Sequence, residues 1–369
     1  MPLKKAILRL FAQRQFIQTG PAAPPNVVLS ALKGYFRSFG TLNRDDTFYV
    51  IWRKNHGAGF FSNFSFVLAH MKVALDNQMI PIVDFENFPT LYNETQLIDG
   101  ERNSWMYYFS QPSDHSLAEV YSSKSVFFCD GIWPPGLSMN ISKIPGLFTD
   151  VYEKKISFSP ALISRLRESE HIISAKTLGL HFRGKDQNLA PGHWFGPTVQ
   201  QIFGCIDSIL SRHDIDKIFL GTDEPSYLRA LVGRYGDRIT YLDSYRSKNV
   251  IAYNENPRER HRYLLGMEVC VEGILLSRCV GLLCGSSNVS EFAVFHNNGK
   301  FKFIHSIDNG RNSDRALLAA MMYRARTNLP TFFGGLKNDL VITEGGITRR
   351  TKVETSRYKP RGEESGATP

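Results

Sequence analysis

At 369 residues the chain is long for one hydrophobic core, and its 42% hydrophobic and 12% aromatic content is typical of a globular protein with two domains. The net charge is +9, but residues 1–20 carry four basic and no acidic side chains, and residues 345–369 carry six basic and three acidic ones. Because the basic charge is concentrated at the two ends, it does not indicate a nucleic-acid partner.

Residues 1–17 are a basic amphipathic stretch, and Pro21, Pro24 and Pro25 mark a linker after it. The stretch fits either contact with an anionic membrane surface or a terminal helix that packs locally. It lacks the apolar run of a signal peptide, so we expect a cytoplasmic protein, peripheral on the inner face of the membrane if the stretch binds lipid. Five cysteines without a C-x-x-C pair predict reduced thiols and no zinc site.

The first domain is expected over residues 26–168. Its apolar patterns predict strands at 47–52, 80–85 and 125–129 and a helix at 64–77, whereas residues 98–122 show no clear period. A glycine-containing loop joins the first strand to the helix. Such a loop presents backbone N–H groups to an anionic ligand, so we expect a cleft loop formed by His56, Gly57, Gly59, Phe60 and Asn63.

The second domain is expected over residues 169–330, with a C-terminal extension at 331–369 that is disordered from about residue 345. Strands are predicted at 178–182, 217–223, 239–242, 280–284 and 301–305. Helices are predicted between and after them, at 197–212, 225–235, 258–277 and 312–326, and one further helix follows residues 285–291 and ends at residue 295. This alternation predicts an α/β fold with a parallel sheet covered by helices on both faces.

Polar groups follow three of these strands, where the carboxyl ends of a parallel sheet meet at one crevice. They are Arg183-Gly-Lys-Asp186, Thr222-Asp223 and Gly285-Ser-Ser-Asn288. An arginine beside a glycine, and serine hydroxyls at a helix start, suit a phosphate-bearing ligand. The structural alternative is ordinary capping, in which Ser287 or Asn288 begins a helix with Glu291 as a capping-box partner.

The motifs H-F-R-G-K-D, I-F-L-G-T-D and L-L-S-R-C-V-G-L-L-C-G-S-S-N-V-S-E-F-A resemble, in order and spacing, those of a fucosyltransferase superfamily. It contains bacterial nodulation fucosyltransferases, α1,6-fucosyltransferases and protein O-fucosyltransferases. The stretches G-A-G-F-F-S-N-F-S-F-V-L and I-P-I-V-D-F-E-N-F-P-T-L-Y-N resemble the bacterial members, so the resemblance spans about residues 47–310. It implies a GT-B fold, with two Rossmann-like domains facing across a cleft.

The resemblance also implies inverting transfer of fucose from GDP-fucose to a hydroxyl, with no metal or other cofactor. Arg183 matches the arginine that contacts the β-phosphate, and Glu272 matches the acid that pairs with guanine, although a helix-surface acid is an equal alternative. The remaining donor-binding matches and candidates are His181, Gly184, Lys185, Asp223, Ser286, Ser287 and Asn288, with Asp186 as a loop organiser.

The motif departs from the family at Gly184, where many members carry a second arginine, and Lys185 is a substitute for that charge. Residues 187–192 contain no acid, so His193 is the nearest candidate for a general base, with a loop or acceptor-contact role as the alternative. The acceptor is expected to be a glycan of a bacterial surface polysaccharide or a lipid-linked oligosaccharide. Two alternatives stay open: the same fold using another GDP-sugar, and a nucleotide-binding module without transfer activity.

Overall fold

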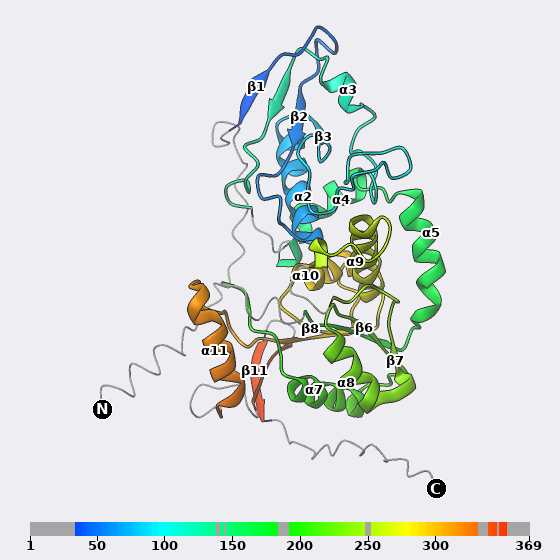
Figure 1. Ribbon diagram of the computed structural model, residues 1–369, viewed down its shortest axis with the longest axis vertical. Coiled ribbons are helices and arrows are strands. Elements are labelled where there is room, and N and C mark those ends of the chain that lie inside the picture. The colour runs from blue at the N-terminus through cyan, green and yellow to red at the C-terminus, as the bar shows by residue number, and fades with distance from the viewer. Residues whose placement is uncertain are drawn as a thin grey trace, which may run out of the picture.

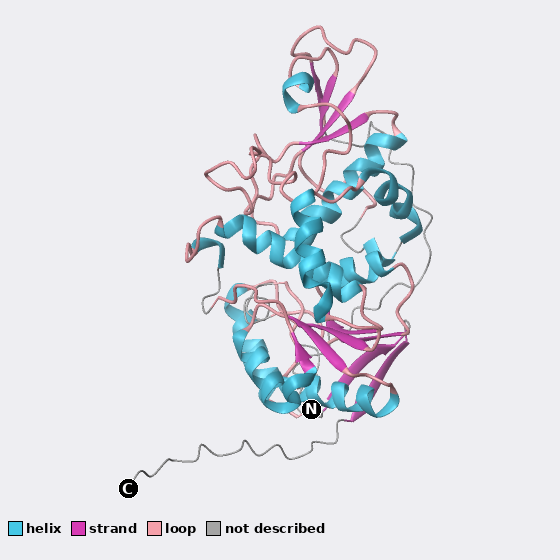
Figure 2. Cartoon of the chain, turned by 90° about the vertical axis from the view of Figure 1, so that its right-hand side faces the viewer, coloured by secondary structure: helices cyan, strands magenta, loops and turns pink. Residues whose placement is uncertain are grey.

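The computed structural model describes residues 34–137, 141–143, 145–183, 192–247, 252–330, 339–344 and 347–352. The expected basic segment at residues 1–25 lies outside these ranges. Figure 1 shows an elongated molecule with one sheet at each end, and Figure 2 shows helices between the two sheets. The prediction of an α/β fold of the GT-B type, with two parallel-sheet units, is confirmed.

The N-terminal part contains a four-stranded sheet in the order β1-β4-β2-β3. Strands β2, β3 and β4 are parallel, and β1 pairs antiparallel with β4 at the edge. The strands are β1 (Tyr35–Arg37), β2 (Phe48–Ile51), β3 (Ile80–Val83) and β4 (Val126–Phe128), and the helices are α2 (Phe60–Asp76), α3 (Leu117–Val120), α4 (Pro145–Lys155) and α5 (Pro160–Ser169).

The C-terminal part contains a seven-stranded sheet in the order β11-β10-β9-β8-β5-β6-β7. Its strands are β5 (Thr177–His181), β6 (Lys217–Gly221), β7 (Ile239–Thr240), β8 (Gly281–Gly285), β9 (Phe303–Ile307), β10 (Asp339–Glu344) and β11 (Ile347–Lys352). Its helices are α7 (Val199–Arg212), α8 (Pro225–Tyr235), α9 (His261–Ser277), α10 (Asn288–Asn297) and α11 (Ala316–Asn328). Strands β5 to β9 are parallel, and their order reverses between β5 and β8.

Local sequence signals account for several helix starts. Thr198 and Gln201 form a reciprocal capping box at the start of α7. Ser159 caps α5, whose first residue is Pro160, and Glu224 caps α8 before Pro225.

Two sequence-based boundaries need correction. Helix α2 begins at Phe60, four residues before the predicted start, because Phe60 and Phe61 pack into the core. The prediction of disorder from about residue 345 is wrong for residues 347–352, which form β11 against β10. Since β10 and β11 extend the second sheet, the C-terminal part continues beyond the expected boundary at residue 330.

One hydrophobic core joins the two parts of the molecule. It runs from Tyr49 on β2 through α2, α9 and α10 to Leu282 on β8. At its centre the rings of Phe61 and Phe292 stack with centroids 4.0 Å apart, and Gly273 on α9 gives them room. The helices between the sheets therefore fix how the two parts sit relative to each other (Figure 2).

Replacing Gly273 by alanine should destabilise this junction. The added Cβ would lie 2.6 Å from the Phe61 ring and 3.2 Å from the Phe292 ring. Overpacking of this kind costs about 1–3 kcal/mol of unfolding free energy, which urea titration would measure. Gly146→Ala on α4 is the matched control because a Cβ there meets no atom within 4 Å. Equal urea midpoints for Gly273→Ala and Gly146→Ala would contradict the close packing of Phe61 and Phe292 against Gly273.

Among the described residues, no helix is long and apolar enough to cross a membrane.

Candidate active site

The candidate site lies where the order of parallel strands reverses, between β5 and β8. Loops after these two strands leave in opposite directions, and such a switch point opens a crevice for ligands at the carboxyl edge. A small pocket occurs at this place. It is lined by His181, Phe182, Arg183, Phe195, Gly196, Pro197, Gly285, Ser286 and Ser287. Four predicted donor-binding residues, His181, Arg183, Ser286 and Ser287, are thus brought together.

His181 is the last residue of β5 and is buried. Its Nδ1 lies 3.1 Å from the Ser290 hydroxyl and 3.2 Å from the Ser287 hydroxyl, at the start of α10. Burial, and then the positive charge of Arg183, lower the pKa of His181 to about 3. At neutral pH His181 is therefore an uncharged ring that ties α10 to β5.

Ser287 is the N-cap of α10, since its hydroxyl accepts from the Ser290 N–H at 3.1 Å. The capping alternative is thus present at this residue, with Asn288 as the first helical residue. Glu291 does not complete a capping box, because the third residue after the Ser287 cap is Ser290; the Glu291 carboxylate instead accepts from the Ser142 hydroxyl of the N-terminal part. Ser286 and Ser287 at the same helix start also line the pocket, and the start of a helix is a place where backbone N–H groups can bind an anion.

Arg183 follows β5, and 37% of its side chain is exposed. Its Nε lies 3.7 Å from an Asp223 carboxylate oxygen. Asp223 is therefore a partner that holds the guanidinium, and its own negative charge does not suit direct contact with a phosphate. Burial raises the pKa of Tyr92 in the N-terminal part, and the positive charge of Arg183 opposes that rise.

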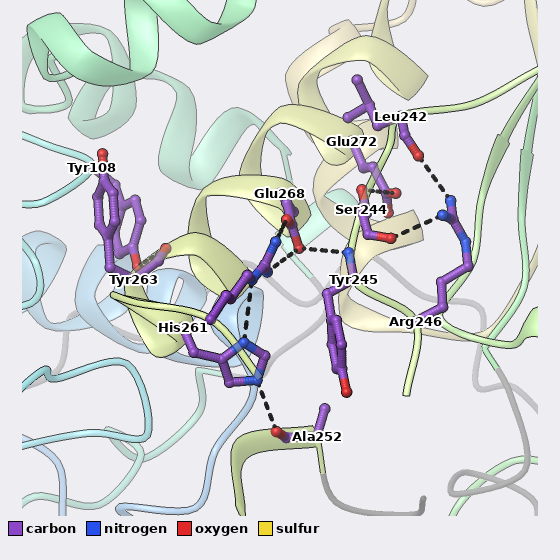
Figure 3. Close-up of polar contacts among 11 residues, drawn as sticks. Tyr108, Leu242, Ser244, Tyr245, Arg246, Ala252, His261, Tyr263, Glu268 and Glu272 are labelled. Atoms are coloured by element: carbon purple, nitrogen blue, oxygen red, sulfur yellow. Dashed lines mark hydrogen bonds and ion pairs between the residues drawn. The ribbon is translucent and has the colours of Figure 1, made fainter. Parts of the chain in front are cut away.

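Glu272 on α9 lies near the end of β6 and is buried at 7% exposure. Its Oε1 accepts a hydrogen bond of 3.0 Å from the Ser244 hydroxyl (Figure 3). Burial raises the pKa of Glu272 to about 8, while the Arg246 charge and the Ser244 hydrogen bond act in the opposite direction. The helix-surface alternative for Glu272 is excluded by this burial.

Arg246 holds the irregular segment after β7 in place. Its guanidinium donates to the backbone carbonyls of Leu242 and Ser244 at 3.1 and 3.0 Å (Figure 3), and to that of Thr222 at 3.1 Å. The Thr222 hydroxyl in turn donates to the Phe182 carbonyl at 2.8 Å, which connects this segment to the Arg183 strand end. Sequence reasoning missed Ser244 and Arg246, because no motif marks a segment that follows a two-residue strand.

A second acid, Glu268, lies one turn before Glu272 on α9. It accepts two hydrogen bonds from Arg258, at 2.6 and 2.9 Å, and one from the Tyr245 backbone N–H at 3.1 Å (Figure 3). Both carboxylate oxygens of Glu268 therefore accept hydrogen bonds from Arg258 or Tyr245. Glu272 accepts through Oε1, and its Oε2 has no hydrogen bond to a described residue.

His193 is exposed on the segment that runs beside residues 310–313. Its carbonyl accepts from the Asn312 N–H, and neighbouring Trp194 bridges to Arg311. Residues 310–313 follow the carboxyl end of β9, which lies on the same edge of the sheet as the carboxyl end of β5 near Arg183. The predicted residues Gly184, Lys185 and Asp186 lie outside the described residues.

The predicted cleft loop of the N-terminal part divides into two groups. Phe60 and Asn63 are buried, Phe60 against Tyr92 and Tyr108, and Asn63 as acceptor of a 2.8 Å hydrogen bond from Arg53. They build the start of α2 and do not face a ligand. The exposed group is His56, Gly57 and Gly59, with the His56 ring 2.6 Å from the Pro89 carbonyl.

Arg53 is a buried cation that the sequence analysis missed. It donates to Asn63 and to the Ser62 hydroxyl, and its guanidinium lies over the Phe66 ring at 4.9 Å. Burial lowers the pKa of Arg53 to about 10. Arg53 therefore orders the first turn of α2, which has no side-chain cap of its own.

Tyrosines and a glutamate join the two parts next to Arg183. The Tyr92 and Tyr253 hydroxyls are 2.5 Å apart, and Glu94 accepts from the Tyr263 N–H at 2.9 Å. An open pocket of about 390 Å³ lies beyond this contact. It is lined by Glu94, Thr95, Gln96, Ile98, Asn256, Pro257, Arg258, Glu259 and Arg260. Its carboxylates, amides and guanidinium groups suit a ligand rich in hydroxyls.

No group of three or more His, Cys, Asp or Glu side chains suited to a metal ion occurs in the described part of the chain.

The chain is similar to solved structures of fucosyltransferases, the superfamily whose motifs it resembles. One is the NodZ α-1,6-fucosyltransferase soaked with GDP-fucose, with 14% identity, coverage of 71% of this chain and 96% of that chain, and a TM-score of 0.47. Another is POFUT1 in complex with GDP-fucose, with 12% identity, coverage of 70% and 96%, and a TM-score of 0.36.

A third is a mutant FUT1 of Arabidopsis thaliana in complex with GDP, with 13% identity, coverage of 72% and 71%, and a TM-score of 0.40. No protein-family model and no curated protein matches the chain.

Proposed function

We propose that this protein is a glycosyltransferase that moves fucose from GDP-fucose to a hydroxyl of a glycan acceptor. The observation that carries the proposal is the grouping at the β5–β8 switch point. A cation, Arg183, and two serines at a helix start, Ser286 and Ser287, line one pocket there. A buried acid, Glu272, lies one strand away.

The two halves of GDP fit different residues of this edge. The diphosphate would contact Arg183 and the N–H and hydroxyl groups at Ser286 and Ser287, with Lys185 as a further cation. The guanine would contact Glu272, because a carboxylate accepts from guanine N1–H and N2–H together. Uracil has no such pair of donors, so this contact selects GDP-sugars over UDP-sugars.

Transfer would proceed by one displacement with inversion. The acceptor oxygen attacks the anomeric carbon of fucose, the bond from that carbon to the β-phosphate oxygen breaks, and its electron pair leaves with GDP. Arg183 would neutralise the charge that develops on the departing diphosphate, so no divalent cation is required in the proposal. The proton of the attacking hydroxyl passes to a base, for which His193 is our candidate.

The acceptor would reach this centre through the pocket between residues 94–98 and 256–260. Its hydroxyl-binding side chains support a glycan, and we propose a surface polysaccharide or a lipid-linked oligosaccharide on the cytoplasmic face of the membrane. A second candidate keeps the fold and the nucleotide but uses another GDP-sugar. It is supported by the contacts above, which recognise the nucleotide and make no distinction between hexoses.

Release of GDP or UDP from a panel of nucleotide sugars tests the proposal, with and without glycan acceptors. We expect turnover with GDP-fucose and none with UDP-sugars. Turnover with another GDP-sugar alone would establish the second candidate. Turnover with UDP-sugars only, or binding of GDP without turnover of any donor, would exclude the transferase assigned here.

His193→Ala tests the proposed base. General-base catalysis contributes about 10²–10⁴-fold, so we expect kcat to fall by about 10²-fold or more, with GDP affinity unchanged. The control is His171→Ala, which removes an imidazole from the turn after α5. Retention of most of the turnover rate by His193→Ala would reject this role.

A further inference from the structure

Strand β1 and the residues after it carry an apolar patch. Four large hydrophobic side chains within eight residues are exposed, namely Tyr35 at 43%, Phe36 at 55%, Phe39 at 39% and Leu42 at 50%. The Tyr35 ring stacks on Phe128 and has the Arg37 guanidinium 5.1 Å from its centroid, and the Phe36 ring contacts Phe127 edge to face. Because β1 is the last strand of its sheet, these side chains form an apolar rim of the N-terminal part. We call them the β1 patch.

Helix α11 carries a second patch on the C-terminal part. Leu317 is exposed at 87%, Leu318 at 38% and Met321 at 67%. Leu317 and Met321 are four residues apart and so lie on one face of the helix. The sequence of α11 contains Arg324 and Arg326 and no acidic residue. A basic helix with an exposed apolar face is typical of a segment that lies on a membrane surface.

The two elements that carry the patches lie on the same side of the molecule. In Figure 1, β1 and α11 are both on the left, one near each end of the long axis. Helix α5, which carries the exposed Ile163, is by contrast on the right. Single exposed hydrophobic residues are ordinary, whereas two clusters on one side indicate a contact surface.

The charges around the patches are mixed, with a small excess of cations. Arg37, Arg44 and Lys124 are exposed near the β1 patch, together with exposed Asp45 and half-buried Asp46, and exposed Asp314 and Arg315 precede α11. The chain before β1 adds four basic and no acidic residues within its first twenty. Cations that flank apolar side chains complement an anionic lipid surface.

We propose that the β1 patch and the α11 patch together rest on an anionic lipid bilayer, so that the molecule binds the membrane along one side. Two separated patches on one side fit a broad, nearly flat partner better than a single small protein. The apolar side chains would enter the boundary between headgroups and acyl chains, and the cations would contact the headgroups. This surface is separate from the nucleotide pocket and does not depend on the proposed transfer.

Sedimentation with vesicles of phosphatidylcholine containing roughly a third phosphatidylglycerol tests the inference on the full chain. We expect the protein to sediment with these vesicles, less so at high salt and less so with pure phosphatidylcholine. Leu317→Glu with Met321→Glu, and separately Phe36→Ser, should each weaken binding by about tenfold or more. The matched control is Ile163→Glu with Val232→Glu, which changes two exposed hydrophobic residues of α5 and α8.

Equal binding of the Leu317/Met321 variant and the Ile163/Val232 control would overturn the proposal. So would a full loss of binding when Lys4, Lys5, Arg9 and Arg14 become serine while both patch variants bind normally, since the N-terminal cations would then act alone. A dimer in lipid-free solution that the patch variants convert to monomer, without vesicle binding by the unmodified protein, would assign the surface to a second copy.

Discussion

Replacing Arg183 by alanine is expected to lower kcat/KM for GDP-fucose by about 10³-fold and to abolish the thermal stabilisation given by GDP. Removal of one donor that stabilises developing charge costs about 10²–10³ in rate, and Arg183 also contributes to ground-state binding of the diphosphate. The variant leaves Asp223 without this ion pair, and its negative charge then opposes the ligand. Steady-state kinetics and thermal unfolding with and without GDP measure both effects.

Arg183→Lys and Arg229→Ala are the controls for this prediction. Lysine keeps the charge but not the flat donor group, so partial rescue of kcat/KM is expected. Arg229 is exposed on α8, and its loss should leave both measurements unchanged. A GDP-induced shift that survives in Arg183→Ala would place the diphosphate elsewhere. Addition of DNA should leave the unfolding temperature of each of these proteins unchanged.

Glu272→Gln is expected to weaken GDP binding by about 10²-fold while it stabilises the empty protein. The amide cannot accept two guanine hydrogen bonds, and a hydrogen bond to a charged group contributes about 1.5–3 kcal/mol. Selectivity for GDP over UDP should fall by the same factor. Calorimetric titration with GDP and with UDP would measure both affinities. Glu153→Gln on the exposed side of α4 is the matched control.

The stabilisation should depend on pH in a defined direction. Burial raises the pKa of Glu272 to about 8, so the folded protein holds a proton that the unfolded chain releases near its ordinary pKa. The stability contributed by this proton is fully present below about pH 4.5 and is lost as pH rises to about 8. Glutamine does not titrate, so Glu272→Gln does not lose this stability as pH rises. Its unfolding free energy should therefore exceed that of the unmodified protein by more at pH 8 than at pH 5, by up to a few kcal/mol.

GDP affinity of the unmodified protein should rise with pH through the same window. The empty site holds Glu272 mainly protonated at pH 7, and guanine requires the carboxylate form. We expect affinity to increase toward pH 8 and then level off, whereas Glu272→Gln should lack this component. A variant that loses stability, or an affinity profile that Glu272→Gln does not change, would argue that Glu272 is only a buried structural acid.

Part of the fold was determined by local patterns in the sequence. The α/β alternation of residues 177–307 predicted β5, β6, β8 and β9 within one or two residues, because buried parallel strands read as short apolar runs. The same patterns missed β1, α4 and α5. These elements are short or only partly buried, so their apolar residues do not form a clear period.

The chemistry at the strand ends was also visible in the sequence. Arg183 and Ser287 follow directly after strands, and parallel strands bring such residues to one edge whatever the rest of the fold does. Their meeting at the switch point required the strand order, which depends on pairing between residues about a hundred positions apart. Phe60 and Asn63, predicted for a cleft loop, turned inward because the start of α2 is part of the shared core.

Only the tertiary structure decided the state of Glu272. The sequence favoured a guanine-binding acid and a helix-surface acid equally for Glu272, because a position on a helix does not reveal whether other elements cover the side chain. Burial beneath the segment held by Arg246 raises the pKa of Glu272, and a hydrogen bond from Ser244, 28 residues away, only partly opposes that rise. Burial and long-range contacts of this kind arise from packing, which local periodicity does not encode.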